Sequence, residues 1–208
     1  MQSYSWHLRS CDWLAKIDIP IEARSCHVPQ LPFATTLPAR NGTFPFIDQT
    51  YGKKKMPMHP LVRPIHRDDY GAWRPLWDGY NAFYGRSGAT ALDERVTAQT
   101  WERFLDPTEC MYAFVAELDG RIVGIVHFLY HRSTSRLGDV CYLQDLFTDE
   151  SFRGRGVGRA LIQKVLDAAR ERGSSRVYWT TQTSNAAGRA LYDKMAEHHG
   201  FIVYSHEL

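Results

Sequence analysis

Arg153-Gly154-Arg155-Gly156-Val157-Gly158-Arg159 is a glycine-rich stretch with three arginines, and it lies between two regular segments. A strand-like apolar run over residues 140–147 precedes it, and an amphipathic, helix-like run over residues 157–172 follows it. A glycine-rich turn at a helix start gathers backbone N–H groups around one point, and the helix dipole and the arginines add positive charge there. The stretch therefore predicts a binding site for the pyrophosphate group of a ligand.

The spacing of these glycines excludes two common phosphate-binding motifs. A P-loop requires a lysine directly after its last glycine, and Gly158 is followed by Arg159. The dinucleotide fingerprint Gly-x-Gly-x-x-Gly also fails, because Gly158 comes one residue too early. The pattern that fits is Arg/Gln-x-x-Gly-x-Gly/Ala, which Arg153, Gly156 and Gly158 satisfy.

Hydrophobic periodicity predicts strands and helices throughout residues 58–208. The dipeptide Asp119-Gly120 joins two β-prone runs and favours a hairpin, because both turn positions need a positive φ. A strand, a helix and a second strand around the glycine turn predict a parallel strand pair. The expected strands cover residues 61–65, 111–118, 121–130, 140–147, 176–181 and 201–204, and the expected helices cover residues 68–84, 97–105, 157–172 and 185–198.

Residues 1–57 differ in character from residues 58–208. They contain prolines at positions 20, 29, 32, 38, 45 and 57 and no sustained periodicity. We expect an N-terminal extension that is poorly ordered, followed by one domain over residues 58–208. The alternative is an arm that packs on the domain or on a partner, which the aromatic residues Trp6, Trp13, Phe33, Phe44 and Phe46 favour.

Composition excludes several classes of function. The formal net charge of +2 is close to balanced, so nucleic acid and anionic membrane are not expected partners. No apolar stretch is long enough to span a bilayer, and no signal peptide is expected. The four cysteines form no CxxC pair and have no metal-like spacing with histidine, so we expect reduced thiols, no metal and a cytoplasmic location.

The glycine pattern in its setting resembles the acetyl-coenzyme A site of the GNAT superfamily of N-acetyltransferases. The strand before it reads Tyr-Leu-Gln-Asp-Leu-Phe-Thr over residues 142–148, and a long amphipathic helix follows it. Within that superfamily these motifs are most similar to the spermidine/spermine-acetyltransferase-like branch. The resemblance covers residues 58–208 and implies an α/β (α+β) fold, with a mixed central sheet, a parallel pair at the cofactor site and about four flanking helices.

The resemblance implies acetyl-CoA as co-substrate and assigns residues to it. The backbone of the turn would bind the pyrophosphate, and the end of the preceding strand would pair with the pantetheine amides as an added strand does. One N–H group of that strand would then act as an oxyanion donor. The implied cofactor-binding residues are Leu146, Phe147, Thr148, Arg153, Gly154, Arg155, Gly156, Val157, Gly158, Arg159 and Asn185.

Asn185 and Tyr192 are seven residues apart and share one face of the expected last helix, with a rise of about 10 Å between them. Gly188 lies between them, and close approach of pantetheine is a plausible reason for a glycine inside a helix. The resemblance places the asparagine on the cofactor and the tyrosine near its sulfur. A phenol can protonate a departing thiolate, so we expect Tyr192 to be the general acid.

The acceptor site is expected near the first helices. Tyr80 or Tyr84, with Asp78, could hold a cationic amine, although core packing is the alternative interpretation of this aromatic stripe. Gln144 is a further candidate for binding the acceptor. It stands where polyamine acetyltransferases have a glutamate and cannot take a proton, which weakens the case for a polyamine substrate. Asp145, His127 and His131 are further candidates for a base, and none of them is assigned.

These features predict an acetyl-CoA-dependent N-acetyltransferase that acts on a primary amine of a small molecule by direct attack. The alternative is an acetyl-CoA-binding sensor or regulatory module without turnover. A nucleic-acid binder that uses the arginines is a third, less favoured hypothesis. A closing strand over residues 201–204 would leave an exposed sheet edge, so we also expect a homodimer.

Overall fold

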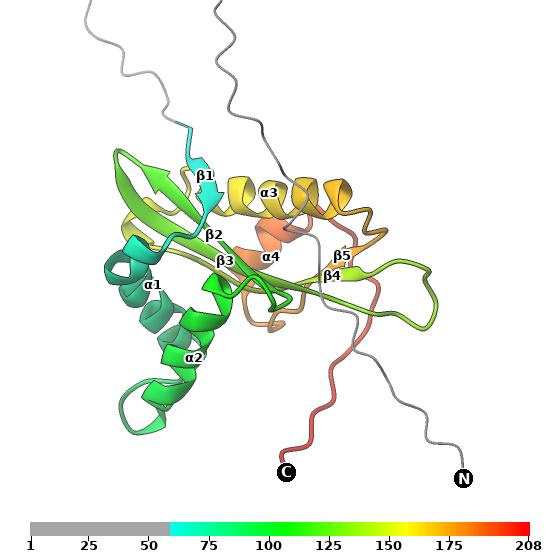
Figure 1. Cartoon of the computed structure of the whole chain (residues 1–208), viewed down its shortest axis with the longest axis horizontal. Helices are drawn as coiled ribbons and strands as arrows, with labels where there is room; N and C mark the ends of the chain where they lie inside the picture. Colours follow the sequence, from blue (N-terminus) through cyan, green and yellow to red (C-terminus); the bar gives the residue numbers. More distant parts are fainter. Residues whose placement is uncertain (1–58) are drawn as a thin grey trace, which may run out of the picture. The chain divides into compact units, whose positions relative to one another are not determined.

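The computed structural model describes residues 59–208. The expected extension over residues 1–57 lies outside the described residues, so the domain boundary at residue 58 stays a prediction. The described part contains a five-stranded sheet in the order β1-β2-β3-β4-β5 (Figure 1). The strands are β1 (Leu61–Pro64), β2 (Met111–Leu118), β3 (Arg121–His131), β4 (Val140–Thr148) and β5 (Val177–Tyr178).

Four α-helices flank this sheet, which confirms the expected mixed α/β fold. They are α1 (Tyr70–Phe83), α2 (Glu94–Leu105), α3 (Val157–Glu171) and α4 (Ala186–Tyr192), with short 3-10 turns at Arg67–Asp69, Gly88–Thr90 and Glu150–Phe152. Figure 1 shows α1 and α2 on one side of the sheet and α3 on the other. The strands β1 to β4 pair antiparallel, whereas β4 and β5 pair parallel, as predicted.

Two hydrophobic cores, one on each face of the sheet, hold these layers together. The α3 side contains Phe114, Phe128 and Leu161, and the α1 and α2 side contains Trp73, Val115 and Ile125. Adjacent residues of one strand, such as Phe114 and Val115, contribute to opposite cores because side chains alternate along a strand. The aromatic stripe of α1 is therefore core in part, with Trp73, Trp77 and Tyr80 all buried.

Several predicted boundaries are wrong. Helix α1 begins at Tyr70 and continues through Pro75, α2 begins at Glu94 behind its cap Asp93, and α4 ends at Tyr192 instead of residue 198. The expected strand over residues 176–181 keeps only Val177–Tyr178. Among the described residues, none of the helices is long and apolar enough to cross a membrane.

The expected closing strand over residues 201–204 does not form. Phe201 is 81% exposed and Tyr204 is 87% exposed. A strand needs a neighbouring backbone to pair its N–H and C=O groups. Within residues 59–208, the sheet ends at β5, and no strand pairs with residues 201–204.

Gly124 in β3 allows α3 to pack directly on the sheet. A Cβ atom at this position would lie 2.7 Å from Val157 Cγ1 and 3.2 Å from the carbonyl oxygen of Phe147. The first distance is far below ordinary van der Waals contact, and the second neighbour is backbone, which cannot move alone. Gly124 therefore sets how closely the start of α3 approaches β3.

We expect Gly124→Ala to lower the free energy of unfolding by about 1–3 kcal/mol, because the added methyl group overpacks the contact between β3 and α3. Urea unfolding followed by circular dichroism measures this change. Gly71→Ala in α1 is the matched control, since a Cβ atom there meets nothing within 4 Å. An equal loss of stability in both variants would contradict the packing role of Gly124.

Candidate functional site

The glycine turn leads into the start of α3, and the space around its glycines is open. Gly154 and Gly156 have φ angles of 74° and 83°, and a Cβ atom at either position would meet nothing within 4 Å. Ala160 donates its N–H to the carbonyl oxygen of Gly156 at 3.0 Å. The first N–H groups of a helix have no acceptor within the helix, so those before Ala160 point outward and suit an anion.

The arginines of the turn pack on aromatic rings beside it. Arg153 lies 5.8 Å from the ring centroid of Phe147 and donates from Nε to the carbonyl oxygen of Thr148 at 3.3 Å. Arg155 lies 5.4 Å from the ring centroid of Phe152, and Arg159 is exposed on the first turn of α3. These guanidinium groups add positive charge around the same N–H groups. The side chain of Val157 is buried, so only its backbone can contribute to the site.

Strands β4 and β5 separate soon after they begin to pair. Their register contains only Cys141 with Val177 and Tyr142 with Tyr178, whereas β4 continues to Thr148. Over residues 146–148, β4 is paired on its other edge with β3. Among the described residues, no strand forms hydrogen bonds with the free edge of β4 beyond Tyr142. The structure thus has the separation of parallel strands that an extended ligand needs.

Asn185 caps α4 and is held on both sides of its amide. Its Oδ1 accepts from the N–H of Gly188 at 3.0 Å, and its Nδ2 donates to Thr181 Oγ1 at 2.9 Å. A Cβ atom at Gly188 would lie 2.5 Å from Nδ2 of Asn185. The group that needs a glycine here is therefore the amide of Asn185, and the expectation that Gly188 makes room for pantetheine is wrong.

Tyr192 is the last residue of α4 and lies half-buried against Trp179, with ring centroids 5.6 Å apart. Burial raises the pKa of Tyr192 to about 12, and the phenol of Tyr84 adds to this effect. A Cβ atom at Gly158 would lie 3.2 Å from Leu191 Cδ2, so the end of α4 packs near the start of α3. Tyr192 is thus a fully protonated phenol at neutral pH, near the glycine turn and near Tyr84.

A bulge in β4 decides where the side chains beside the opening point. His127 pairs with Asp145, whereas the next residue of β3, Phe128, pairs with Leu143, so Gln144 is the extra residue of β4. A bulge changes which face the following side chains occupy. Leu143 belongs to the α3 core, while Asp145 faces His127 on the α1 side. Sequence alternation alone does not reveal this change of face.

Asp145 belongs to a buried polar network. His127 is 2% exposed and Asp145 is 6% exposed. The Nε1–H of Trp73 donates to Nε2 of His127 at 3.0 Å, and Nδ1 of His127 lies 2.9 Å from Oδ2 of Asp145. Because Nε2 accepts a hydrogen bond, the proton of a neutral imidazole sits on Nδ1 and is donated to Asp145.

A pocket of about 530 Å³ joins the predicted acceptor residues. It contains Tyr80, Tyr84 and Gln144 as expected, and Asp145 as well. It also contains Arg86, which no sequence signal marked, because the residue lies in an ordinary polar turn after α1. The other lining residues are Trp77, Leu92, Val96, Thr100, Met111, Tyr142, Thr180, Thr181, Gln182 and Val203.

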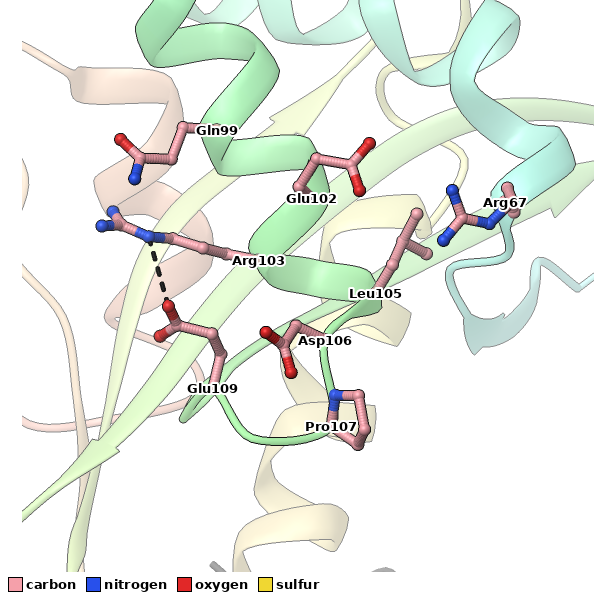
Figure 2. A pocket seen from close by; sticks show the side chains of 8 residues that line it. All are labelled: Arg67, Gln99, Glu102, Arg103, Leu105, Asp106, Pro107 and Glu109. Carbon is pink, nitrogen blue, oxygen red and sulfur yellow. Dashed lines mark ion pairs between the residues drawn. The ribbon is translucent and has the colours of Figure 1, made fainter.

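A second hollow, of about 350 Å³, lies at the C-terminal end of α2. Figure 2 shows its side chains, which include an ion pair between Arg103 and Glu109 with 3.5 Å between Nε and Oε1. Its lining residues are Arg67, Gln99, Glu102, Arg103, Leu105, Asp106, Pro107 and Glu109. None of the predicted site residues is among them, so the larger pocket is the candidate acceptor site.

Two other candidates from the sequence lie outside this pocket. Asp78 accepts from Nε of Arg74 at 2.9 Å on the exposed side of α1, so its expected role in holding an amine is wrong. His131 contacts the hydroxyl of Tyr178 at 2.9 Å and the carbonyl oxygen of Arg132 at 2.8 Å, and it does not line the pocket. In residues 59–208, no three His, Cys, Asp or Glu side chains are grouped as metal ligands.

We expect Trp73→Phe to lower the free energy of unfolding by about 1–3 kcal/mol more than Trp101→Phe, because it leaves Nε2 of His127 buried without a donor. Trp101 is a buried indole in the same core, and the ring nitrogens of His127 are already bound by Trp73 and Asp145. Denaturant unfolding of both variants measures the difference. Equal losses of unfolding free energy in the two variants would show that the hydrogen bond from Trp73 to His127 does not stabilise the fold, and that only the smaller ring matters.

Comparison with known sequences finds acetyltransferases. The sequence profile of the Acetyltransferase (GNAT) family matches residues 73–196. A D-amino-acid N-acetyltransferase of Saccharomyces cerevisiae is 35% identical over 147 residues, which cover 69% of this chain and 88% of that protein. An L-2,4-diaminobutyric acid acetyltransferase of Nocardia farcinica is 37% identical over 86 residues, which cover 41% of this chain and 43% of that protein.

Solved structures share the fold at lower identity. A ribosomal-protein-alanine N-acetyltransferase from Brucella melitensis biovar Abortus 2308 superposes with a TM-score of 0.62 at 22% identity, covering 73% of this chain and 99% of that one. The acetyltransferase AAC(6')-Iy in complex with the bisubstrate analogue CoA-S-monomethyl-acetylneamine superposes with a TM-score of 0.60 at 19% identity, covering 73% of this chain and 99% of that one.

Proposed function

The chain belongs to the GNAT family of acetyltransferases, and from this premise we propose that it transfers the acetyl group of acetyl-CoA to a primary amine of a small molecule. The observation that carries the proposal is the opening between β4 and β5, where pairing ends at Tyr142 although β4 continues to Thr148. Acetyl-CoA is the co-substrate, and the enzyme is an acyltransferase. The two sequence relatives are named for D-amino acids and for L-2,4-diaminobutyric acid, which supports a small acceptor.

The donor groups of the site suit the parts of acetyl-CoA. The N–H groups from Gly154 to Arg159, with the guanidinium groups beside them, would hold the pyrophosphate. The open edge of β4 over Leu146, Phe147 and Thr148 would pair with the pantetheine amides, as an added strand does. Asn185 would contribute to cofactor binding indirectly, because it caps the N-terminus of α4 and so holds that helix in place. This assignment places the thioester end near Tyr192.

Tyr192 has the protonation state that a general acid needs. Acetyl-CoA supplies an activated acetyl group whose transfer to an amine releases a thiol. The amine nitrogen forms the new bond to the acetyl carbon as the C–S bond breaks, and Tyr192 donates its phenolic proton to the departing sulfur. The proton that the amine loses passes to solvent and restores the phenol. Atoms and charges then balance as an N-acetyl amide and a free thiol.

From the motif over residues 142–147, we also propose that the chain is related to the spermidine/spermine-acetyltransferase-like branch. This relationship does not extend to the substrate, since Gln144 is neutral where that branch has a glutamate. We also propose a cytoplasmic location, where acetyl-CoA and small amines are both present.

The proposal is tested by thermal unfolding with acetyl-CoA and by thiol release across amino acids, diamines, polyamines and aminoglycosides. Acetyl-CoA at a hundred times its Kd should stabilise the fold by about 2.7 kcal/mol. At least one amine should then release free thiol. Absence of stabilisation would sink the proposal. Stabilisation without thiol release from any amine would favour the sensor module instead.

We expect Tyr192→Phe to lower kcat by about 100-fold with little change in the KM for acetyl-CoA, because it removes the acid and keeps the ring. Since burial raises the pKa of Tyr192 to about 12, the acid is lost only as pH rises through that value. The kcat of the wild-type enzyme should therefore show no alkaline decline from this residue below about pH 10. Steady-state kinetics across pH measures both effects.

Tyr70→Phe in α1 is the control for this substitution, because Tyr70 does not line the pocket. It should leave kcat unchanged. Retention of wild-type kcat in Tyr192→Phe would remove the proposed acid role, while leaving acetyl transfer itself untouched.

We propose that the chain forms a homodimer through residues 201–204. Ile202 and Val203 are exposed together with Phe201 and Tyr204, and an exposed apolar run of this kind marks an interaction surface. Light scattering after gel filtration should give a dimer mass for the wild-type chain and a monomer mass for Ile202→Asp. A monomeric wild-type chain at micromolar concentration would contradict the proposal.

A further inference from the structure

The larger pocket contains two ionised side chains of opposite sign. Among its lining residues, Asp145 carries a negative charge and Arg86 carries a positive charge, and the others are neutral at pH 7. A site for a polyamine would require several carboxylates. One carboxylate and one guanidinium instead match a molecule that carries an ammonium group and a carboxylate.

Asp145 is a buried carboxylate without a cation beside it. In the described part of the chain, its one ion-pair partner is His127, which accepts a hydrogen bond from Trp73 at Nε2 and is therefore neutral. A buried charge that lacks a counterion is costly. The neutral hydrogen bond from Nδ1 of His127 fixes the direction of the carboxylate without adding a positive charge.

Arg86 is held in place with its fork free to bind an anion. Its Nε donates to Oδ1 of Asn81 at 2.8 Å, and Asn81 is held in turn by the carbonyl oxygen of Trp77 at 2.8 Å. Within residues 59–208, no acceptor binds the two terminal nitrogens of Arg86. A guanidinium group with both terminal nitrogens available binds a carboxylate with two parallel hydrogen bonds.

Tyr80 connects the two charges. The guanidinium carbon of Arg86 lies 5.7 Å from the ring centroid of Tyr80 and 5.7 Å from that of Tyr84. Burial and the nearby carboxylate of Asp145 raise the pKa of Tyr80, whereas Arg86 lowers it. Both charged groups thus act on one phenol ring. Asp145 and Arg86 line the same pocket of about 530 Å³, so one small ligand can contact both charges.

On the basis of the proposed acetyl transfer, we propose that the acceptor is a zwitterionic amino acid, whose ammonium group binds Asp145 and whose carboxylate binds Arg86. The bound ammonium group supplies the missing counterion of Asp145. It also places the amine that is acetylated on the side of the pocket next to β4, and the ammonium group gives one proton to solvent before its nitrogen attacks the thioester. Arg86 discriminates against amines that carry no carboxylate.

The test compares amino acids with their α-amides by thiol release. Alanine, methionine and phenylalanine are each assayed as both enantiomers, with the matching amides and with a diamine. We expect kcat/KM to be about 10- to 100-fold higher for the preferred amino acid than for its amide, since a charged hydrogen-bonded contact is lost in the amide. The amide has the less basic amine, so amine reactivity cannot produce this preference.

Two variants separate the roles of the charges. Arg86→Gln should lower kcat/KM for the amino acid about 10- to 100-fold and leave the value for the amide unchanged, so that the preference disappears. Asp145→Asn should lower kcat/KM for the acid and the amide by the same factor, because both have the ammonium group. Arg132→Gln, on an exposed arginine outside the pocket, is the control and should keep the wild-type preference.

Turnover of the amide by Arg86→Gln shows in the same assay that this variant is folded. Equal kcat/KM for acid and amide in the wild-type enzyme would overturn the assignment of Arg86 but leave acetyl transfer standing. Loss of both activities in Arg86→Gln would also contradict a role limited to the carboxylate. Failure of every amine to release thiol would instead remove the proposed function and this inference together.

Discussion

Strand β4 pairs with β3 along its length but with β5 only at Cys141 and Tyr142, and the rest of the site depends on this one-sided pairing. A backbone edge that remains open inside a sheet is available to an extended ligand. The start of α3 and the end of α4 pack close to each other, since a Cβ atom at Gly158 would lie 3.2 Å from Leu191 Cδ2. The proposed cofactor site combines the open edge of β4 with these two helix ends.

The bulge at Gln144 allows β4 to contribute to the acceptor pocket as well as to the proposed cofactor site. Because it changes the face of the residues that follow, β4 contributes Leu143 to the α3 core and Asp145 to the pocket beside α1. Trp73 and His127 then hold Asp145 by hydrogen bonds that stay within the buried core. The stability of this core and the charge of the acceptor pocket are therefore coupled, since one buried indole supports both.

Features with local causes could be predicted from the sequence. The glycine turn, the Asp119-Gly120 hairpin and the parallel pair follow from turn chemistry and periodicity, and the structure confirms them. The bulge could not be predicted, because it depends on which residue of β3 lies opposite Gln144. Arg86 and the crowding of Gly188 by Asn185 depend on tertiary packing as well. The closing strand over residues 201–204 was predicted from a local sequence pattern, which does not reveal whether a neighbouring strand is present to pair with it.

The central claim is that the opening between β4 and β5 receives acetyl-CoA with its pyrophosphate on the glycine turn. A crystal structure of the enzyme with coenzyme A tests this directly. The account predicts pyrophosphate oxygens about 3 Å from the backbone nitrogens between Gly154 and Arg159, pantetheine paired with β4 beyond Tyr142, and the sulfur beside the Tyr192 hydroxyl. A coenzyme A molecule bound elsewhere, or β5 paired with β4 up to Thr148, would contradict it.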